Sequence, residues 1–265
     1  MDLELYSQVK SSVKQILGID LNHYKDEQMR RRLDSWLVRS GEPNWERYFS
    51  RLRADSSELS RFRNYLTINV SEFFRDAERW QTLRTKILPD LIKESRAPSH
   101  LSGLRIFSAG CSIGPEPYSL AIIMNEVARG QPFTLIATDL DRGALSKAQA
   151  RGPYTVEEIR NVTPEQRAAF FETGGPPFYV TAKLSRQISF REQNLLQDPF
   201  DSNFDLVVCR NVIIYFTFEA KAVLYDKFSR ALRPGGILFL GGTEIIPKPQ
   251  EYSLQSFGIS FYKKV

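Results

Sequence analysis

The chain has 265 residues, of which 42% are apolar and 25% are charged, so it has room for one large and one small soluble domain. No run of about 18 apolar residues is present, and the N-terminus has neither the basic flank nor the apolar core of a signal peptide. These features exclude a membrane-spanning helix and predict a cytoplasmic protein. The net charge of +5 is modest, and no basic patch is interleaved with aromatic residues, so a nucleic-acid partner is not expected.

Residues 1–80 are predicted to form a small all-helical domain. Their apolar residues recur at helical spacing, and turn residues interrupt the pattern near 18–20 and 40–43. A further helix is expected over 81–97, at the start of a second domain that spans 81–265.

From residue 104 onward, short apolar runs alternate with helix-like segments. Strands are expected over 104–108, 133–138, 187–192, 204–209, 236–241 and 257–263, and helices over 116–129, 141–150, 163–171 and 218–232. This alternation predicts an α/β fold with a doubly wound, mainly parallel sheet that is covered on both faces. The run Gly-Gly-Pro-Pro at 174–177 predicts a small antiparallel β-insertion over about 172–192.

The few cysteines and histidines restrict the chemistry. Cys111 and Cys209, the two cysteines, each lie beside an apolar run, which favours buried reduced thiols over a disulfide. The two histidines, His23 and His100, are not near a cluster of cysteines or carboxylates. We therefore expect neither a metal site nor a serine nucleophile activated by histidine.

A glycine-containing turn follows the first predicted strand. Gly110 and Gly114 would let the backbone turn sharply and approach a ligand, and the next strand ends in Asp139. A carboxylate at that position can accept hydrogen bonds from both hydroxyls of a ribose. Two alternatives remain open, because many strand–helix connections contain such glycines and because Asp139 could instead cap the helix that starts near Asp141.

Glu116 distinguishes between classes of nucleotide. A dinucleotide site needs a third glycine and a helix N-terminus that is free to bind pyrophosphate. Here the third glycine is missing, and Glu116 stands near the helix start, where it would repel phosphate and attract an ammonium group. The pattern favours S-adenosylmethionine, which has a ribose and an amino-acid end but no phosphate, over NAD.

Two further segments carry polar side chains of interest. In residues 67–76, polar residues precede an aromatic pair and Arg75. The alternative is a helix N-terminus capped by Asn69 or Ser71, with the aromatic pair in the core.

The second segment follows the strand predicted over 204–209. Arg210 and Asn211 stand at its carboxyl end, where open α/β sheets bind ligands, and Tyr215 comes shortly after. Asn194 has an equivalent position after the strand predicted over 187–192.

Together these segments resemble the CheR family, the chemotaxis receptor methyltransferases that methylate glutamate side chains. The resemblance covers nearly the whole chain and rests on the ordered motifs N-x-[ST]-x-F-F-R, G-C-S-x-G-x-E-P-Y-S, A-T-D-x-D, C-R-N-V-x-I-Y-F and L-x-P-G-G-x-L-F. It implies the S-adenosylmethionine-dependent methyltransferase fold, S-adenosylhomocysteine as the product, and the cytoplasmic helical domain of chemotaxis receptors as the protein substrate.

The resemblance also implies roles for individual residues. The cofactor-binding residues would be Asn69, Ser71, Arg75, Gly110, Glu116, Asp139, Asn194, Leu195, Arg210 and Asn211. Among them, Glu116 would engage the amino-acid end of the cofactor, Asp139 the ribose, and Asn194 with Leu195 the adenine. Arg75 and Tyr215 would be the catalytic residues.

The chemistry that the resemblance implies needs no general base. A glutamate with a pKa of about 4.3 is already ionised at pH 7, and a sulfonium is an activated methyl donor. What remains is alignment, which can contribute about 7–11 kcal/mol of the barrier. Arg75 would position the incoming carboxylate, and Tyr215 would help to orient the reacting groups.

A protein substrate needs a docking surface. Lys25, Arg32 and Arg39 recur every seven residues along one flank of the helix predicted over 21–39. The alternative is an ordinary solvated face, but the resemblance implies acidic methylation regions in the substrate, which favours a basic docking stripe. We expect a monomer, without a receptor tether at the short β-insertion. Two other functions remain open here, namely a small-molecule O-methyltransferase and a non-catalytic module that senses S-adenosylmethionine.

Overall fold

The computed structural model describes residues 1–67, 69–95 and 103–265, and the chain divides into two compact units. The helical unit comprises Met1–Asn69 and Tyr215–Ala222, and the sheet unit comprises Val70–Ile214 and Val223–Val265. Within the described residues, no helix has both the length and the apolar character that crossing a bilayer requires.

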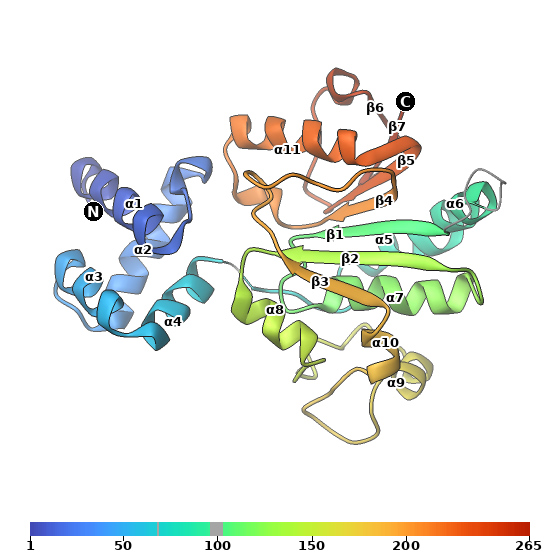
Figure 1. Cartoon of the computed structure of the whole chain (residues 1–265), viewed down its shortest axis with the longest axis horizontal. Helices are drawn as coiled ribbons and strands as arrows, with labels where there is room; N and C mark the ends of the chain where they lie inside the picture. Colours follow the sequence, from blue (N-terminus) through green and yellow to red (C-terminus); the bar gives the residue numbers. More distant parts are fainter. Residues whose placement is uncertain (68, 96–102) are drawn as a thin grey trace. The chain divides into compact units, whose positions relative to one another are not determined.

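The helical unit contains α1 (Leu3–Leu17), α2 (Asp26–Ser40), α3 (Trp45–Ala54) and α4 (Ser56–Leu66), with the 3-10 turn η1 (Leu21–His23) between the first two (Figure 1). Side-chain oxygens of Asp2, Asn44 and Asp55 cap α1, α3 and α4. Aromatic side chains fill the core, where the indole of Trp36 donates a 2.6 Å hydrogen bond to the Tyr48 hydroxyl. The all-helical N-terminal domain predicted from the sequence is confirmed.

The segment Tyr215–Ala222 belongs to the helical unit although it lies far along the sequence. Its backbone is hydrogen-bonded on both sides of Tyr24: the Lys25 amide donates to the Tyr215 carbonyl at 2.9 Å, and the Thr217 amide donates to the His23 carbonyl at 2.8 Å. The rings of Tyr24 and Phe216 lie 5.0 Å apart.

The sheet unit is built on seven strands in the order β3-β2-β1-β4-β5-β7-β6 (Figure 1). The strands are β1 (Leu104–Ala109), β2 (Phe133–Asp139), β3 (Ile188–Glu192), β4 (Phe204–Cys209), β5 (Leu232–Leu240), β6 (Leu254–Ser256) and β7 (Phe261–Lys264). β7 runs antiparallel to both of its neighbours, and the other strand pairs are parallel. The doubly wound, mainly parallel sheet predicted from the alternating pattern is confirmed.

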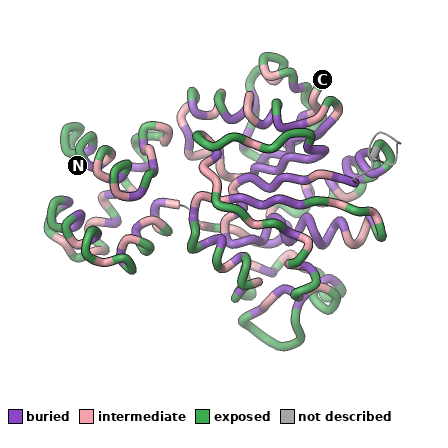
Figure 2. Tube along the Cα trace, viewed as in Figure 1, coloured by how far each residue is buried: buried purple, intermediate pink, exposed green. Residues whose placement is uncertain are grey.

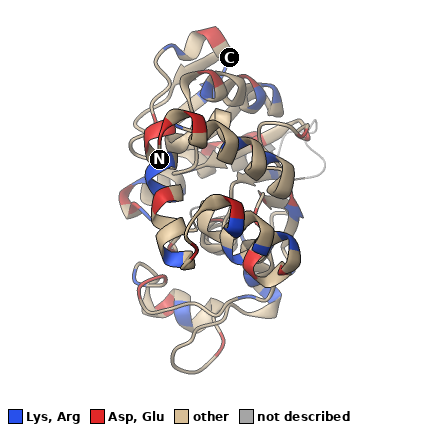
Figure 3. Cartoon of the chain, turned by 90° about the vertical axis from the view of Figure 1, so that its left-hand side faces the viewer, with Lys and Arg blue, Asp and Glu red and all other residues tan. Residues whose placement is uncertain are grey.

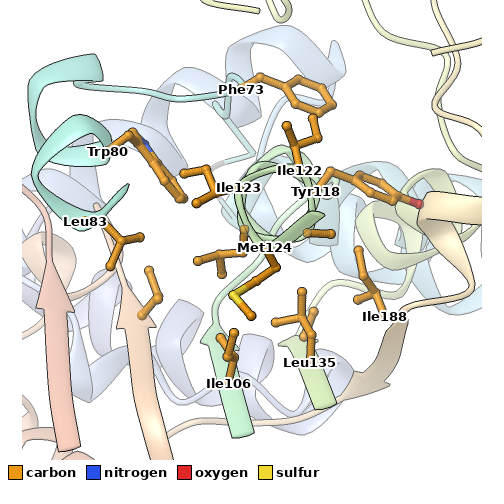
Figure 4. Close-up of a cluster of buried hydrophobic side chains, with 14 of the residues drawn as sticks. Phe73, Trp80, Leu83, Ile106, Tyr118, Ile122, Ile123, Met124, Leu135 and Ile188 are labelled. Atoms are coloured by element: carbon orange, nitrogen blue, oxygen red, sulfur yellow. The ribbon is translucent and has the colours of Figure 1, made fainter. Parts of the chain in front are cut away.

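Helices bury the sheet. They are α5 (Ala77–Thr82), the π-helical turn η2 (Leu83–Ile87), α6 (Leu88–Ser95), α7 (Pro115–Val127), α8 (Arg142–Gln149), α9 (Pro164–Phe170), α10 (Ala182–Ser185) and α11 (Phe218–Ala231), with the 3-10 turns η3 (Ile213–Tyr215) and η4 (Pro249–Tyr252). The central strands are buried along most of their length (Figure 2), as expected for parallel strands with continuous apolar runs. Figure 4 shows α7 contributing Tyr118, Ile122 and Met124 to a core shared with Ile106 of β1 and Leu135 of β2.

The structure differs from the sequence expectations at two boundaries. The helical unit ends at Asn69 rather than at residue 80, because Phe73, Phe74 and Trp80 are buried in the core of the sheet unit (Figure 4 labels Phe73 and Trp80). Antiparallel pairing starts before the predicted insertion, through the bridges Tyr154↔Phe178 and Phe171↔Val180. The end of the predicted insertion forms β3, which is the parallel partner of β2.

Candidate functional site

The carboxyl ends of β1, β2, β4 and β5 meet at one edge of the sheet. The segments that leave this edge are 110–116, 139–141, 210–211 and 241–244. In an open α/β sheet this edge is where ligands bind. The strand order therefore brings together three features predicted from the sequence. They are the glycine turn at 110–114, the strand end at Asp139 and the Arg210–Asn211 pair.

The turn after β1 requires glycine at its first position. Gly110 has a φ of +79°, and a Cβ there would lie 2.6 Å from a methyl carbon of Val212. The amides of Gly110 and Cys111 both donate to the Thr138 carbonyl, at 2.8 and 2.9 Å. The turn is thus fixed against the end of β2 by its own backbone.

Asp139 connects two turns at this edge. Its Oδ2 accepts a 2.7 Å hydrogen bond from the Ser112 amide, and its Oδ1 accepts a 2.9 Å hydrogen bond from the Asp141 amide. The cap of α8 comes from Asp141, which accepts from the Gly143 and Ala144 amides, so the helix-cap alternative for Asp139 is wrong. Burial raises the pKa of Asp139 to about 6, against the opposing effect of these backbone hydrogen bonds.

Glu116 lies in the first turn of α7, directly after Gly114 and Pro115. Its Oε1 accepts a 2.7 Å hydrogen bond from the Ser108 hydroxyl of β1. Burial raises the pKa of Glu116 to about 7, and the nearby Arg210 guanidinium opposes that rise. A carboxylate at this helix start excludes a phosphate group and can attract a cation.

Arg210 follows β4 and reaches into the segment that carries Arg75. Its Nη2 donates to the Arg75 carbonyl and to Asp76 Oδ2, both at 2.7 Å. Its guanidinium lies over the rings of Trp80 and Phe239, 5.3 and 4.8 Å from their centroids. Burial lowers the pKa of Arg210, and nearby carboxylates oppose that change.

The segment before α5 is an irregular turn. Phe73 and Phe74 are buried, as the alternative for this segment expected, but the helix begins at Ala77, so a helix capped by Asn69 or Ser71 is wrong. The Phe74 amide donates to Ser119 Oγ at 3.0 Å. Arg75 Nη1 lies 3.2 Å from the Val70 carbonyl of the same segment.

Asn194 and Leu195 form a turn after β3. Asn194 Oδ1 accepts from the Leu196 amide at 3.1 Å, and the Asn194 amide donates to Asp198 Oδ2 at 2.7 Å. Lys227 of α11 holds the turn from outside, because its Nζ donates to the Leu195 carbonyl at 2.5 Å.

Glu244, a buried residue that follows β5, was not predicted from the sequence as part of this region. Its Oε2 accepts from the Gly241 amide at 2.6 Å and from the Asn211 amide at 2.8 Å. These bonds join the turns after β4 and β5 and hold Asn211 at a φ of +59°. The available signal was a carboxylate just after a predicted strand and a glycine pair, similar to the pattern that identified Asp139.

Ser71 belongs to the sheet unit, whereas Asn69, Tyr215 and the three residues of the basic stripe belong to the helical unit. Asn69 donates from its side-chain amide to Thr67 Oγ1 at 3.4 Å, and Tyr215 ends the 3-10 turn η3. The helix predicted over 21–39 begins only at Asp26, so Lys25 is the residue before α2, whereas Arg39 lies in its last turn. Both side chains belong to exposed residues. Figure 3 shows that positions of basic and of acidic residues both occur along the helices of this unit.

Arg32 is held more tightly than the other two cations of the stripe. Its guanidinium donates to the Tyr65 carbonyl and lies 4.6 Å from the centroid of the Tyr65 ring. Arg39 lies on the same ring at 5.4 Å. Burial lowers the pKa of Arg32. Arg32 therefore packs the helical unit as well as carrying charge.

Comparison with known proteins gives matches over both units. The model of the CheR methyltransferase SAM-binding domain matches residues 69–260, and that of the CheR methyltransferase all-alpha domain matches residues 4–67. The chemotaxis protein methyltransferase of Listeria monocytogenes is 40% identical over 252 residues, which cover 95% of this chain and 94% of that protein. The chemotaxis protein methyltransferase 1 of Pseudomonas aeruginosa is 32% identical, and the match covers 96% of this chain and 93% of that protein. The chemotaxis protein methyltransferase of Salmonella typhimurium is also 32% identical, and the match covers 88% of this chain and 80% of that protein.

Proposed function

Because this chain belongs to the CheR methyltransferase family, we propose that it transfers the methyl group of S-adenosylmethionine to glutamate side chains of chemotaxis receptors. The products would be a glutamate methyl ester and S-adenosylhomocysteine. The observation that carries the proposal is the placement of Asp139, Glu116 and Arg210 at one edge of a sheet matched by the SAM-binding domain model. The relatives named above are chemotaxis protein methyltransferases, which favours receptor methylation over the two alternative functions.

The residues at this edge fit S-adenosylmethionine. The Asp139 carboxylate accepts one backbone hydrogen bond on each oxygen. Each carboxylate oxygen can accept a further hydrogen bond, so the group suits the hydroxyls of a ribose. Glu116 suits an ammonium group and rejects the pyrophosphate of a dinucleotide. We assign cofactor binding to Asn69, Ser71, Arg75, Gly110, Glu116, Asp139, Asn194, Leu195, Arg210 and Asn211.

The bound cofactor supplies an activated methyl group on a sulfonium. Arg75 orients the carboxylate of the receptor glutamate, and its guanidinium exchanges the Val70 carbonyl seen here for that carboxylate. Tyr215 helps to orient the reacting groups. No side chain has to remove a proton, since the acceptor is already ionised at pH 7 with a pKa of about 4.3.

We assign receptor docking to the basic stripe formed by Lys25, just before α2, and by Arg32 and Arg39 of α2. The exposed Lys25 and Arg39 carry most of the attraction, because Arg32 also packs against Tyr65. An acidic receptor helix would be drawn to this stripe by a long-range interaction that salt screens. The enzyme acts as a monomer in this proposal.

The test is a transfer assay with receptor-containing membranes and S-adenosylmethionine labelled in its methyl group. We expect label that mild base releases as methanol, because a carboxyl methyl ester is base-labile. Arg75→Ala serves as the matched inactive variant. Label that resists base, or label that appears equally with Arg75→Ala, would contradict the proposal.

A further inference from the structure

We propose that Asp76 and Arg210 form a clamp that positions Arg75 for methyl transfer. The inference rests on the proposed function of Arg75. In it, Arg210 has a positioning role that is separate from its contact with the cofactor. Asp76 is a residue that the sequence motifs did not single out.

The clamp holds the backbone of Arg75 itself. The Arg75 carbonyl accepts two hydrogen bonds, from Arg210 Nη2 at 2.7 Å and from Trp80 Nε1 at 2.8 Å. The same Arg210 nitrogen pairs with Asp76 Oδ2 at 2.7 Å. Because two donors meet at one carbonyl, the start of the Arg75 side chain is fixed relative to β4 and α5.

The ion pair joins a buried cation to a partly exposed anion. The Arg210 side chain is 2% exposed and is held between Trp80 and Phe239, whereas the Asp76 side chain is 48% exposed. A buried guanidinium is costly to leave unpaired. The Asp76 carboxylate therefore stays against Arg210 rather than turning to solvent. Within the described residues, Arg210 Nε has no hydrogen-bond partner, so the Nη2 contacts carry the attachment.

The backbone on both sides of Arg75 has an uncommon conformation that surrounding contacts have to hold. Phe74 and Asp76 flank Arg75 with φ values of +51° and +59°, a region that is unfavourable for residues other than glycine. Such residues persist where surrounding contacts hold them. Arg75 therefore stands between two strained positions, and its direction depends on the contacts that hold them.

The helix that follows gives independent support. Asp76 is the N-cap residue of α5, where an aspartate usually accepts from the amides of the first turn. Here, among the described residues, its side chain makes no such cap bond and points to Arg210 instead. The carboxylate is used for the clamp rather than for helix capping.

The far end of the segment has its own anchors. The Phe73 amide donates to the Glu158 carbonyl at 2.8 Å, and Glu72 pairs with Arg160 at 2.7 Å. Loosening the clamp would therefore free the Arg75 end of the segment without detaching the whole segment.

The test uses Asp76→Asn, which removes the charge while keeping the side-chain size and the tolerance of asparagine for positive φ. The matched control is Asp226→Asn on α11, which removes an aspartate of similar exposure, 46%, from a surface pair with Arg230. We expect Asp76→Asn to lower kcat by about 10–100-fold, since small misplacements of a positioning group have effects of that size. The dissociation constant for S-adenosylhomocysteine should change by no more than about threefold in calorimetry, because the clamp acts on the methyl-transfer step rather than on cofactor binding. The control should match the wild type in both measurements.

A double variant with Arg75→Lys separates positioning from general destabilisation, because lysine keeps the positive charge and hence a measurable residual turnover. If Asp76 acts through Arg75, Asp76→Asn should cause little further loss of turnover in the Arg75→Lys background. Equal losses in both backgrounds would overturn the clamp, because they would show that Asp76 acts independently of Arg75.

A second readout does not depend on the receptor. In protein labelled with 15N-tryptophan, the Trp80 indole signal, assigned with Trp80→Phe, reports on the hydrogen bond to the Arg75 carbonyl. We expect this signal to shift and its proton to exchange faster in Asp76→Asn but not in Asp226→Asn. An unchanged Trp80 signal overturns the clamp. Absence of methyl ester with the wild-type protein would instead overturn the proposed function, and the indole signal would then decide the clamp alone.

Discussion

Replacing Glu116 by glutamine should raise the free energy of unfolding of the cofactor-free protein and lower its affinity for S-adenosylmethionine. The pKa of Glu116 is about 7 in the folded chain against an ordinary 4.5. At about 1.4 kcal/mol per pKa unit, ionising this carboxyl in the folded protein costs about 3 kcal/mol at pH 8. The glutamine side chain would keep an oxygen that accepts from Ser108 and would carry no charge to bury.

The sign and the pH window follow from the direction of that change. A carboxyl with a raised folded-state pKa contributes stability below its unfolded pKa of 4.5, and this contribution is lost as pH rises through about 7. The difference in stability between Glu116→Gln and the wild type should therefore grow by about 2–3 kcal/mol between pH 5 and pH 8. Urea unfolding followed by circular dichroism at several pH values measures it.

The matched control is Glu192→Gln, which removes a carboxylate from the surface pair with Arg142. It should follow the pH dependence of the wild type. In calorimetry, Glu116→Gln should bind S-adenosylmethionine about 10–100-fold more weakly, the size of a lost hydrogen bond to a charged group. A stability difference that stays constant from pH 5 to pH 8 would refute the assignment of Glu116 as a buried carboxyl of raised pKa.

Three further outcomes are expected. Arg75→Ala should abolish methyl transfer while affinity for the cofactor falls much less; equal losses in the transfer assay and in calorimetry would contradict this division of labour. Charge reversal at Arg32 and Arg39 should weaken receptor methylation, most strongly at low salt, with Arg53→Glu as a control on the same unit; unchanged kinetics would remove α2 from the docking model. Cofactor affinity should rise from pH 5 to pH 7 as Asp139, with a pKa of about 6, and Glu116, with a pKa of about 7, ionise, and Asp139→Asn should remove the Asp139 part of this rise in calorimetry; a variant that keeps the full rise would refute the role of Asp139.

Much of the sheet could be predicted because its central strands are buried on both faces. Such strands appear in the sequence as continuous apolar runs, so β1, β2 and β4 lie where the runs predicted them. The last predicted strand was less accurate, because Gly258 and Ser260, both at positive φ, form a turn between β6 and β7. A local turn of this kind is not visible in hydrophobic periodicity alone.

The parts of the candidate site that depend on local sequence could be predicted, whereas those that depend on tertiary contacts could not. The turn at Gly110 and the carboxylate of Asp139 are local features at strand ends. The clamp joins Asp76 to Arg210, two residues 134 positions apart, and only the fold brings them together. The burial of Glu244 likewise depends on its two backbone donors, Gly241 and Asn211, which come from different turns.

The most direct test of the account is to find which atom receives the methyl group. A purified cytoplasmic receptor fragment is incubated with the enzyme and with S-adenosylmethionine that carries a deuterated methyl group, and its peptides are mapped by mass spectrometry. The account predicts the label on glutamate side chains and its loss after mild base treatment. Label on lysine, cysteine or another side chain, or a fragment without label, would contradict it.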